Sequence, residues 1–187
     1  MSEILRQNID RIKIYDYIKV GKSKSKVNKK IHEQIKFVLL ASLNYNSNEE
    51  VLVSINTSSY DTKVAFGNNE YTVMTPEMKE AIMNSTSSFV TIHNHPSNLG
   101  FSIGDLELFI NKLKIQLMIV VTNDCKKCFA LYKSSYINVK LSEYLLDEID
   151  SYKLISNKTD GDDALPLIKL LINKVGLQYE EVVNYEF

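Results

Sequence analysis

Cysteine and histidine are scarce in this chain, and long apolar runs are missing. Its 187 residues include two cysteines and three histidines. The longest apolar stretches, such as Leu117 to Val121, are far too short to cross a membrane. The N-terminus carries charged residues from the start, unlike a targeting signal. We therefore expect no membrane span and a cytoplasmic location.

The two cysteines form a single Cys-x-x-Cys pair, Cys125 and Cys128. Such a pair can carry redox chemistry or half of a zinc site. Here it follows Asn123 and Asp124, between two apolar runs, which is typical of a hairpin turn. We expect a structural turn with reduced thiols.

Charge is unevenly distributed, although the formal net charge is only -1. Residues 1–30 carry nine Lys and Arg against three Asp and Glu, whereas residues 141–187 carry four against ten. The lysine-rich segment 21–26 suits contact with nucleic acid or an acidic partner. A solvated linker before the first core helix explains the same composition, and this is the interpretation we favour.

Apolar spacing predicts alternating helices and strands, and 44% hydrophobic composition is enough for one core. The turn signals and helix caps between the apolar segments set their approximate bounds. Helices are predicted over 27–43, from the N-cap Thr75 to Met83, from Ser102 or Gly104 to 113, from 141 to about 152, and over 165–175. Strands are predicted over 51–55, 63–66, 71–74, 89–93, 115–122 and 129–133, and the tail 178–187 is left unassigned.

The segment 93–105 carries most of the functional information. His93 and His95 are separated by one residue, so on an extended backbone both imidazoles leave the same face. With Asp105 they make a set of three ligands that suits zinc and leaves a fourth position to water. Histidines satisfied by hydrogen bonds, and an aspartate that merely begins a helix, are the alternatives.

The pattern His93-x-His95-Pro96-Ser97 followed by Ser102-x-x-Asp105 resembles the JAMM motif of the JAB/MPN metalloprotease superfamily. Asn94 between the histidines and the Pro-Ser pair resemble its bacterial RadC-like and phage or mobile-element branch. Six residues separate His95 from Ser102, one fewer than is common in the family. We expect Gly100 to allow this tighter path.

The resemblance implies a mixed α/β (α+β) fold, with a curved mixed sheet flanked by helices. It covers about residues 27–140, which would form the catalytic domain. Residues 1–26 would be a basic N-terminal extension, and residues 141–187 a helical, acidic C-terminal extension.

The resemblance also assigns roles around a zinc cofactor held by His93, His95 and Asp105. A glutamate at the entry of the first strand acts as the proton-transferring base in this superfamily. Glu50 is the preferred candidate, because strand alternation puts its side chain on the opposite face of the strand from the core-facing Val51. Glu49 is the alternative. The hydroxyl of Ser102 would donate a hydrogen bond to the oxyanion. Serine at this position also fits a helix N-cap.

The leading functional hypothesis is a zinc-dependent peptidase or isopeptidase of JAMM type that acts on a protein or peptide amide bond. The alternative is a noncatalytic RadC-like module that binds a protein or nucleic acid and keeps the metal for stability. Replacing Glu50 with Gln separates the two hypotheses. Neither the particular substrate nor the oligomeric state is predicted.

Overall fold

A computed structural model describes residues 2–19, 23–67, 74–134 and 137–183. The helices in this part of the chain are α1 (Ser2–Asp10), α2 (Lys24–Tyr45), α3 (Pro76–Asn84), α4 (Ile103–Asn111), α5 (Val139–Ser156) and α6 (Leu165–Val175). The strands are β1 (Val51–Asn56), β2 (Thr62–Phe66), β3 (Phe89–His95), β4 (Ile115–Thr122), β5 (Lys127–Lys133) and β6 (Leu177–Val183).

The strands form one six-stranded sheet in the order β2-β1-β3-β4-β5-β6. Only β3 and β4 pair in parallel, and the other neighbours are antiparallel. Helix α4 connects the parallel pair, as such a crossover requires. The predicted α+β class, a mixed sheet flanked by helices, is confirmed.

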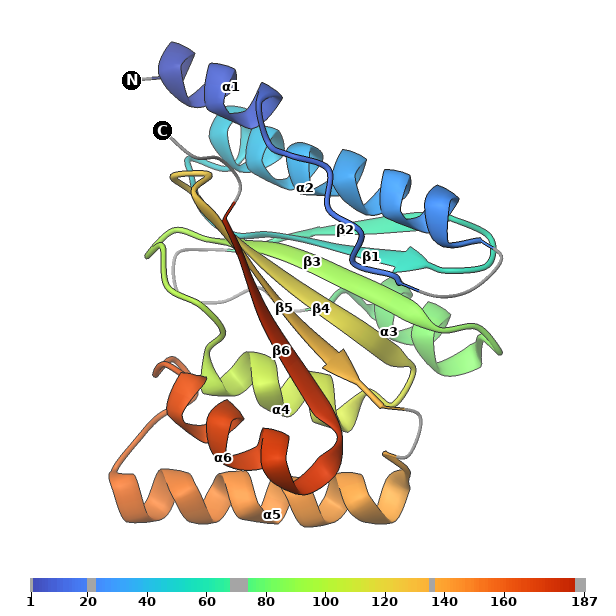
Figure 1. Cartoon of the computed structure of the whole chain (residues 1–187), viewed down its shortest axis with the longest axis vertical. Coiled ribbons are helices and arrows are strands. Elements are labelled where there is room, and N and C mark those ends of the chain that lie inside the picture. The colour runs from blue at the N-terminus through green and yellow to red at the C-terminus, as the bar shows by residue number, and fades with distance from the viewer. Residues whose placement is uncertain (1, 20–22, 68–73, 135–136, 184–187) are drawn as a thin grey trace.

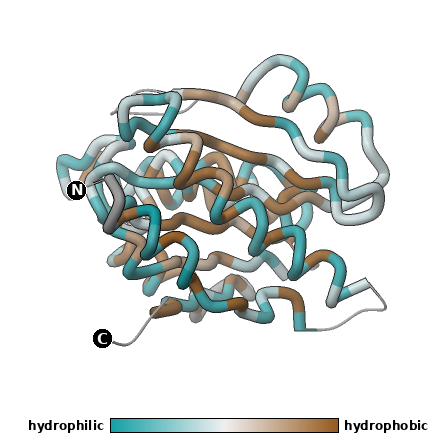
Figure 2. Tube along the Cα trace, turned by 90° about the horizontal axis from the view of Figure 1, so that it is seen from above, coloured by the Kyte–Doolittle hydropathy of each residue, from teal (hydrophilic) through white to brown (hydrophobic). Residues whose placement is uncertain are grey.

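Helices cover both faces of this sheet (Figure 1). α1 and α2 pack on one face, and α4, α5 and α6 on the other. Hydrophobic residues follow the strands through the middle of the fold, with hydrophilic helix turns outside (Figure 2). The central strands are buried on both faces, as expected for a sheet covered on both sides. The histidine-bearing strand therefore lies deep in the molecule.

Most predicted elements are present, with shifted ends. α2 begins at Lys24, three residues before the prediction, so part of the lysine-rich segment is helical. The N-cap Thr75 accepts a hydrogen bond from the Met78 amide, as predicted. The predicted strand 71–74 falls almost wholly outside the described residues, and Met74 itself is not in a strand.

The C-terminal segment is part of the same sheet and core. β6 pairs with β5 along its whole length, from Leu177 opposite Lys133 to Val183 opposite Lys127. Buried residues of α5 and α6, including Leu145 and Ile168, belong to the same apolar cluster as α4. None of the helices in the described part of the chain is long and apolar enough to span a membrane.

Candidate metal centre

Strand β3 positions both histidines by simple alternation. It pairs with β1 on one side and with β4 on the other, including Leu52 opposite His93 and Thr122 opposite His95. It runs to His95, two residues beyond the predicted end, so both imidazoles lie on the same face and both are buried. Two neighbouring strands thus fix the backbone that carries the pair.

Asp105 completes a compact group of three donors. His93 Nε2 and His95 Nε2 are 3.1 Å apart. Asp105 Oδ1 lies 3.1 Å from His93 Nε2, and its Oδ2 lies 3.3 Å from His95 Nε2. Zinc bonds of about 2.0 to 2.2 Å give a tetrahedron with edges of about 3.3 Å. The spacing of the three side chains therefore fits three of the four coordination positions of a tetrahedral zinc ion, and the fourth remains for another ligand.

Glu50, not Glu49, lines the groove above this group. Glu50 is buried, and its Oε1 lies 3.3 Å from His95 Nε2. Potential ligand atoms of Glu50, His93 and His95 also lie within 4.8 Å of one another. Either carboxylate, Glu50 or Asp105, could therefore join the histidine pair around a metal ion.

The carboxylates shift the protonation equilibria of the site. Burial by itself lowers the pKa of His95, but the hydrogen bond and charge of Asp105 and the charge of Glu50 outweigh it, so the pKa is raised above 6.5. Burial by itself raises the pKa of Asp105, but the neighbouring histidines hold it well below 3.8. Asp105 is thus kept as a carboxylate, the form that binds a cation.

Ser102 fills the N-cap of α4 and also orients Asp105. Its hydroxyl donates to Asp105 Oδ2 at 2.8 Å and accepts from the Asp105 amide at 3.1 Å. The Ser102 amide donates to the same carboxylate oxygen at 2.9 Å, which completes a capping box. Ser102 is therefore the predicted helix N-cap, and donation from its hydroxyl to an oxyanion stays a prediction. Its hydroxyl must turn away from Asp105 to reach an oxyanion.

The loop before Ser102 turns at Asn98, and not at Gly100 as expected. Asn98 adopts a left-handed conformation, with a φ of 56°, while Gly100 is not among the described residues with positive φ. Asparagine tolerates this conformation better than most residues. The Asn98 side chain also accepts a hydrogen bond from the Asp124 amide at 3.0 Å, which ties the turn to the β4–β5 hairpin.

Asn94 points away from the metal group and holds the entry of β1. Its Oδ1 accepts from the Val51 amide at 2.7 Å, and its Nδ2 donates to the Glu49 carbonyl at 3.1 Å. Both sides of Glu50 are thereby attached to β3. Asn94 Nδ2 also donates to Asn123 Oδ1 at 2.7 Å, which includes the β4–β5 turn in the network. The side chain between the histidines is therefore a positioning residue for Glu50.

A groove of about 920 Å³ opens over the site. One wall is formed by α4, and the loop between α5 and α6 supplies Asp160 and Asp163. This loop closes the N-terminus of α4, because the Ile103 amide donates to the Asp162 carbonyl at 2.9 Å and the Gly104 amide to the Asp160 carbonyl at 2.8 Å. Sequence analysis placed these acids in an extension, and nothing local signals their contact with α4.

The third histidine and the cysteine pair lie away from the metal group. His32 is on α2, which covers the opposite face of the sheet, and burial lowers its pKa. Cys125 and Cys128 are buried at the β4–β5 turn and are not joined in a disulfide, as predicted for a structural hairpin with reduced thiols. Burial raises the pKa of Cys125 to about 12, which makes it a poor nucleophile.

Comparison with protein-family models, with curated proteins and with solved structures finds no match for this chain. The similarity to the JAMM motif therefore rests on the residues of the site itself.

Proposed function

We propose that this protein is a zinc-dependent amide hydrolase, a peptidase or isopeptidase of JAMM type. The observation that carries the proposal is the group His93, His95 and Asp105 at tetrahedral spacing, with the buried Glu50 carboxylate beside it. A zinc ion held by the three ligands would lower the pKa of a bound water to about 7. Zinc is the cofactor that the nitrogen and oxygen donors suit.

Each site residue then has a defined task. Glu50 takes the proton of the attacking water and delivers it to the leaving amine, the role of a general base and acid. Ser102 holds Asp105 in place, and its hydroxyl, in contact with this metal ligand, would donate to the developing oxyanion after turning toward it. The first-turn amides of α4 cannot share that task, because all of them have acceptors within the chain. Oxyanion binding thus depends on Ser102 and on the ion.

The open groove favours an extended protein or peptide substrate. Its volume of about 920 Å³ is near the upper end of small-molecule sites, and its walls combine apolar and charged side chains such as Leu108 and Lys112. Cys125 and Cys128 are not joined in a disulfide, which suits a reducing compartment, so we place the activity in the cytoplasm.

The test begins with the zinc content of the purified chain. We expect about one zinc per chain, and none in a His93→Ala, His95→Ala double variant. His32→Ala is the matched control, because it removes the third histidine from the opposite face and should leave the zinc in place. Absence of zinc from the parent chain, even after zinc is added, would contradict the proposal.

Hydrolysis is then tested with Glu50→Gln on a defined peptide library. This variant should keep its zinc and lose about 10²-fold to 10⁴-fold in rate, the usual contribution of a general base. Equal product formation by Glu50→Gln and the parent would contradict the role of Glu50. A parent that binds zinc but cleaves nothing would favour the noncatalytic RadC-like module instead.

A further inference from the structure

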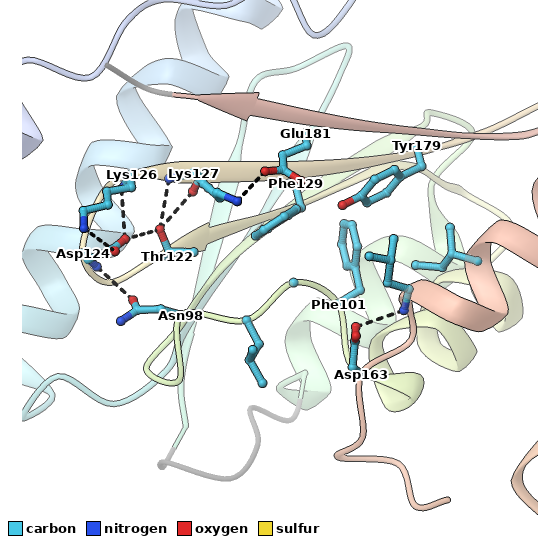
Figure 3. A pocket seen from close by; sticks show the side chains of 14 residues that line it. Asn98, Phe101, Thr122, Asp124, Lys126, Lys127, Phe129, Asp163, Tyr179 and Glu181 are labelled. Atoms are coloured by element: carbon cyan, nitrogen blue, oxygen red, sulfur yellow. Dashed lines mark hydrogen bonds and ion pairs between the residues drawn. The ribbon is translucent and has the colours of Figure 1, made fainter. Parts of the chain in front are cut away.

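A second pocket lies on the other side of the loop that connects His95 to Ser102. Its volume is about 320 Å³, and Figure 3 shows its labelled side chains. Phe101, Phe129 and Tyr179 gather on one side, and Leu165 and Ile168 of α6 complete this apolar part. We call it the aromatic pocket. The Tyr179 ring stands 6.4 Å from the Phe129 ring and 6.4 Å from the Phe101 ring, between centroids.

The opposite side of the aromatic pocket carries charged side chains that form ion pairs with one another. Lys127 Nζ lies 2.6 Å from Glu181 Oε1, and Lys126 Nζ lies 3.7 Å from Asp124 Oδ2. The Lys127–Glu181 pair lies beside Phe129, which is opposite Glu181 in the sheet, and the Lys126–Asp124 pair lies farther from the rings (Figure 3). A charged guest would have to compete with these pairs, whereas a neutral apolar group meets the aromatic rings directly. The chemistry of the aromatic pocket thus selects a neutral apolar guest.

The aromatic pocket and the metal groove share a wall. Leu99, Gly100 and Phe101 line both of them, and Asp163 borders both from the α5–α6 loop. Phe101 directly precedes Ser102, which holds the metal ligand Asp105. An extended polypeptide advances by about 3.3 to 3.6 Å per residue. Three extended residues span about 10 Å, so a chain lying in the groove can cross this shared wall and place a side chain in the aromatic pocket close to the metal group.

We propose that the aromatic pocket is a specificity subsite, which binds a bulky apolar side chain of a polypeptide substrate within about three residues of the cleaved amide. The inference rests on the proposed function and names its substrate class. Tyr179 is the specificity-determining residue, because its ring packs against both of the other two and comes from β6, at the edge of the sheet.

Cleavage of a peptide library by the zinc-loaded chain tests the subsite. Mass spectrometry of the products should show at least about tenfold preference for a large aliphatic or aromatic residue at one fixed position near the cleaved bond. Tyr179→Ala should lower kcat/KM about tenfold or more for these peptides and spare peptides with a small residue there. Tyr179→Phe should keep the preference, and Tyr144→Ala, on the exposed side of α5, is the matched control.

A binding measurement separates failure of the subsite from failure of the proposed function. Peptides captured from the same library by zinc-loaded Glu50→Gln should be enriched in the same bulky residue, and the additional change Tyr179→Ala should remove the enrichment. Enrichment without any cleavage by the parent would support the subsite and overturn the hydrolase. Cleavage without the preference, or a preference that survives Tyr179→Ala, would overturn the subsite, as would captured peptides with no enrichment.

Discussion

Asn94 accepts a hydrogen bond from the backbone amide of Val51 at 2.7 Å, although 43 positions separate the two residues. The same side chain donates to the Glu49 carbonyl, so the segment that carries Glu50 is fixed from both sides. Alternation along β3 thus serves two purposes at once. His93 and His95 face the metal group, and Asn94 between them, which points the other way, holds the backbone on either side of the proposed base Glu50.

Replacing Asn94 with Asp tests this arrangement. The variant keeps an acceptor for Val51 but loses the donor to the Glu49 carbonyl and to Asn123, at a side chain with no exposed surface. A buried carboxylate next to a carbonyl should lower the free energy of unfolding by about 3 kcal/mol. Urea unfolding measures this loss. Asn44→Asp on α2 is the control, and equal unfolding midpoints for the two variants would contradict the prediction.

Ser102→Ala should weaken zinc binding as well as stability. The variant loses the hydroxyl that donates to Asp105 Oδ2 and that caps the Asp105 amide. We expect a loss of about 1 kcal/mol in stability from the missing cap and a 10-fold to 100-fold weaker zinc affinity from the missing orientation of the ligand. Competition with a chromophoric chelator measures the affinity.

Asn138→Ala provides the matched control for the cap alone. Asn138 is the N-cap of α5 and accepts from the Leu141 amide at 3.1 Å. Its replacement should cost similar stability and leave zinc affinity unchanged. If Ser102→Ala and Asn138→Ala have the same zinc affinity, Ser102 is only a helix cap.

The stability of the fold should rise with pH above neutrality because of Lys133. Burial lowers the pKa of this ammonium from 10.5 to about 7. Between these values the unfolded chain holds a proton that the folded chain lacks, so raising the pH favours the folded state, by at most about 1.4 kcal/mol per pH unit. The Phe109 and Lys112 carbonyls accept hydrogen bonds from Lys133 Nζ, and these oppose the shift.

Urea unfolding of the parent and of Lys133→Met from pH 7 to 9.5 measures this contribution. The difference in unfolding free energy, parent minus variant, should grow steadily over this range, because other titrating groups cancel between the two chains. A constant difference would show that Lys133 stays protonated in the fold. The hydrogen bonds from Lys133 Nζ to carbonyls at the C-terminal end of α4 would then stabilise the charged form more than burial destabilises it.

Zinc should stabilise the folded chain by an amount that grows with the logarithm of its concentration above the dissociation constant. At 100 times the dissociation constant, a ligand specific for the folded state adds about 2.7 kcal/mol, which corresponds to a rise in Tm of about 5 to 10 °C for a chain of this size. A chelator should reverse the rise. His95→Ala should show no response to zinc, and His32→Ala should respond as the parent does. A response that persists in His95→Ala would place the zinc elsewhere.

Local sequence patterns predicted the elements that build the site. The apolar run ending in His93, the cap at Ser102 and the stripe of α4 all depend on short-range spacing, and each is present. The choice of Glu50 over Glu49 also followed from strand alternation, and the structure brings Glu50 to the histidines. Where the spacing of apolar residues and the helix caps determine an element, a single sequence is enough to predict it.

Contacts between distant segments were not predictable in the same way. β6 carries Glu180 and Glu181, which look like solvated charges, yet Glu180 accepts from Tyr15 and Tyr132 and Glu181 pairs with Lys127. The α5–α6 loop closes the N-terminus of α4 through its carbonyl oxygens, which leave no mark on side-chain composition. Such partners become visible only after the chain has folded.

The place of β3 in the sheet has a consequence for the supply of metal. Both of its edges are paired, so the sheet orders the backbone of the two histidines whether or not an ion is bound. Domains that fold only around zinc lose their structure when it is withdrawn. For the zinc site proposed above, the chain would instead keep its fold when the ion is withdrawn and offer the same ligands when zinc returns.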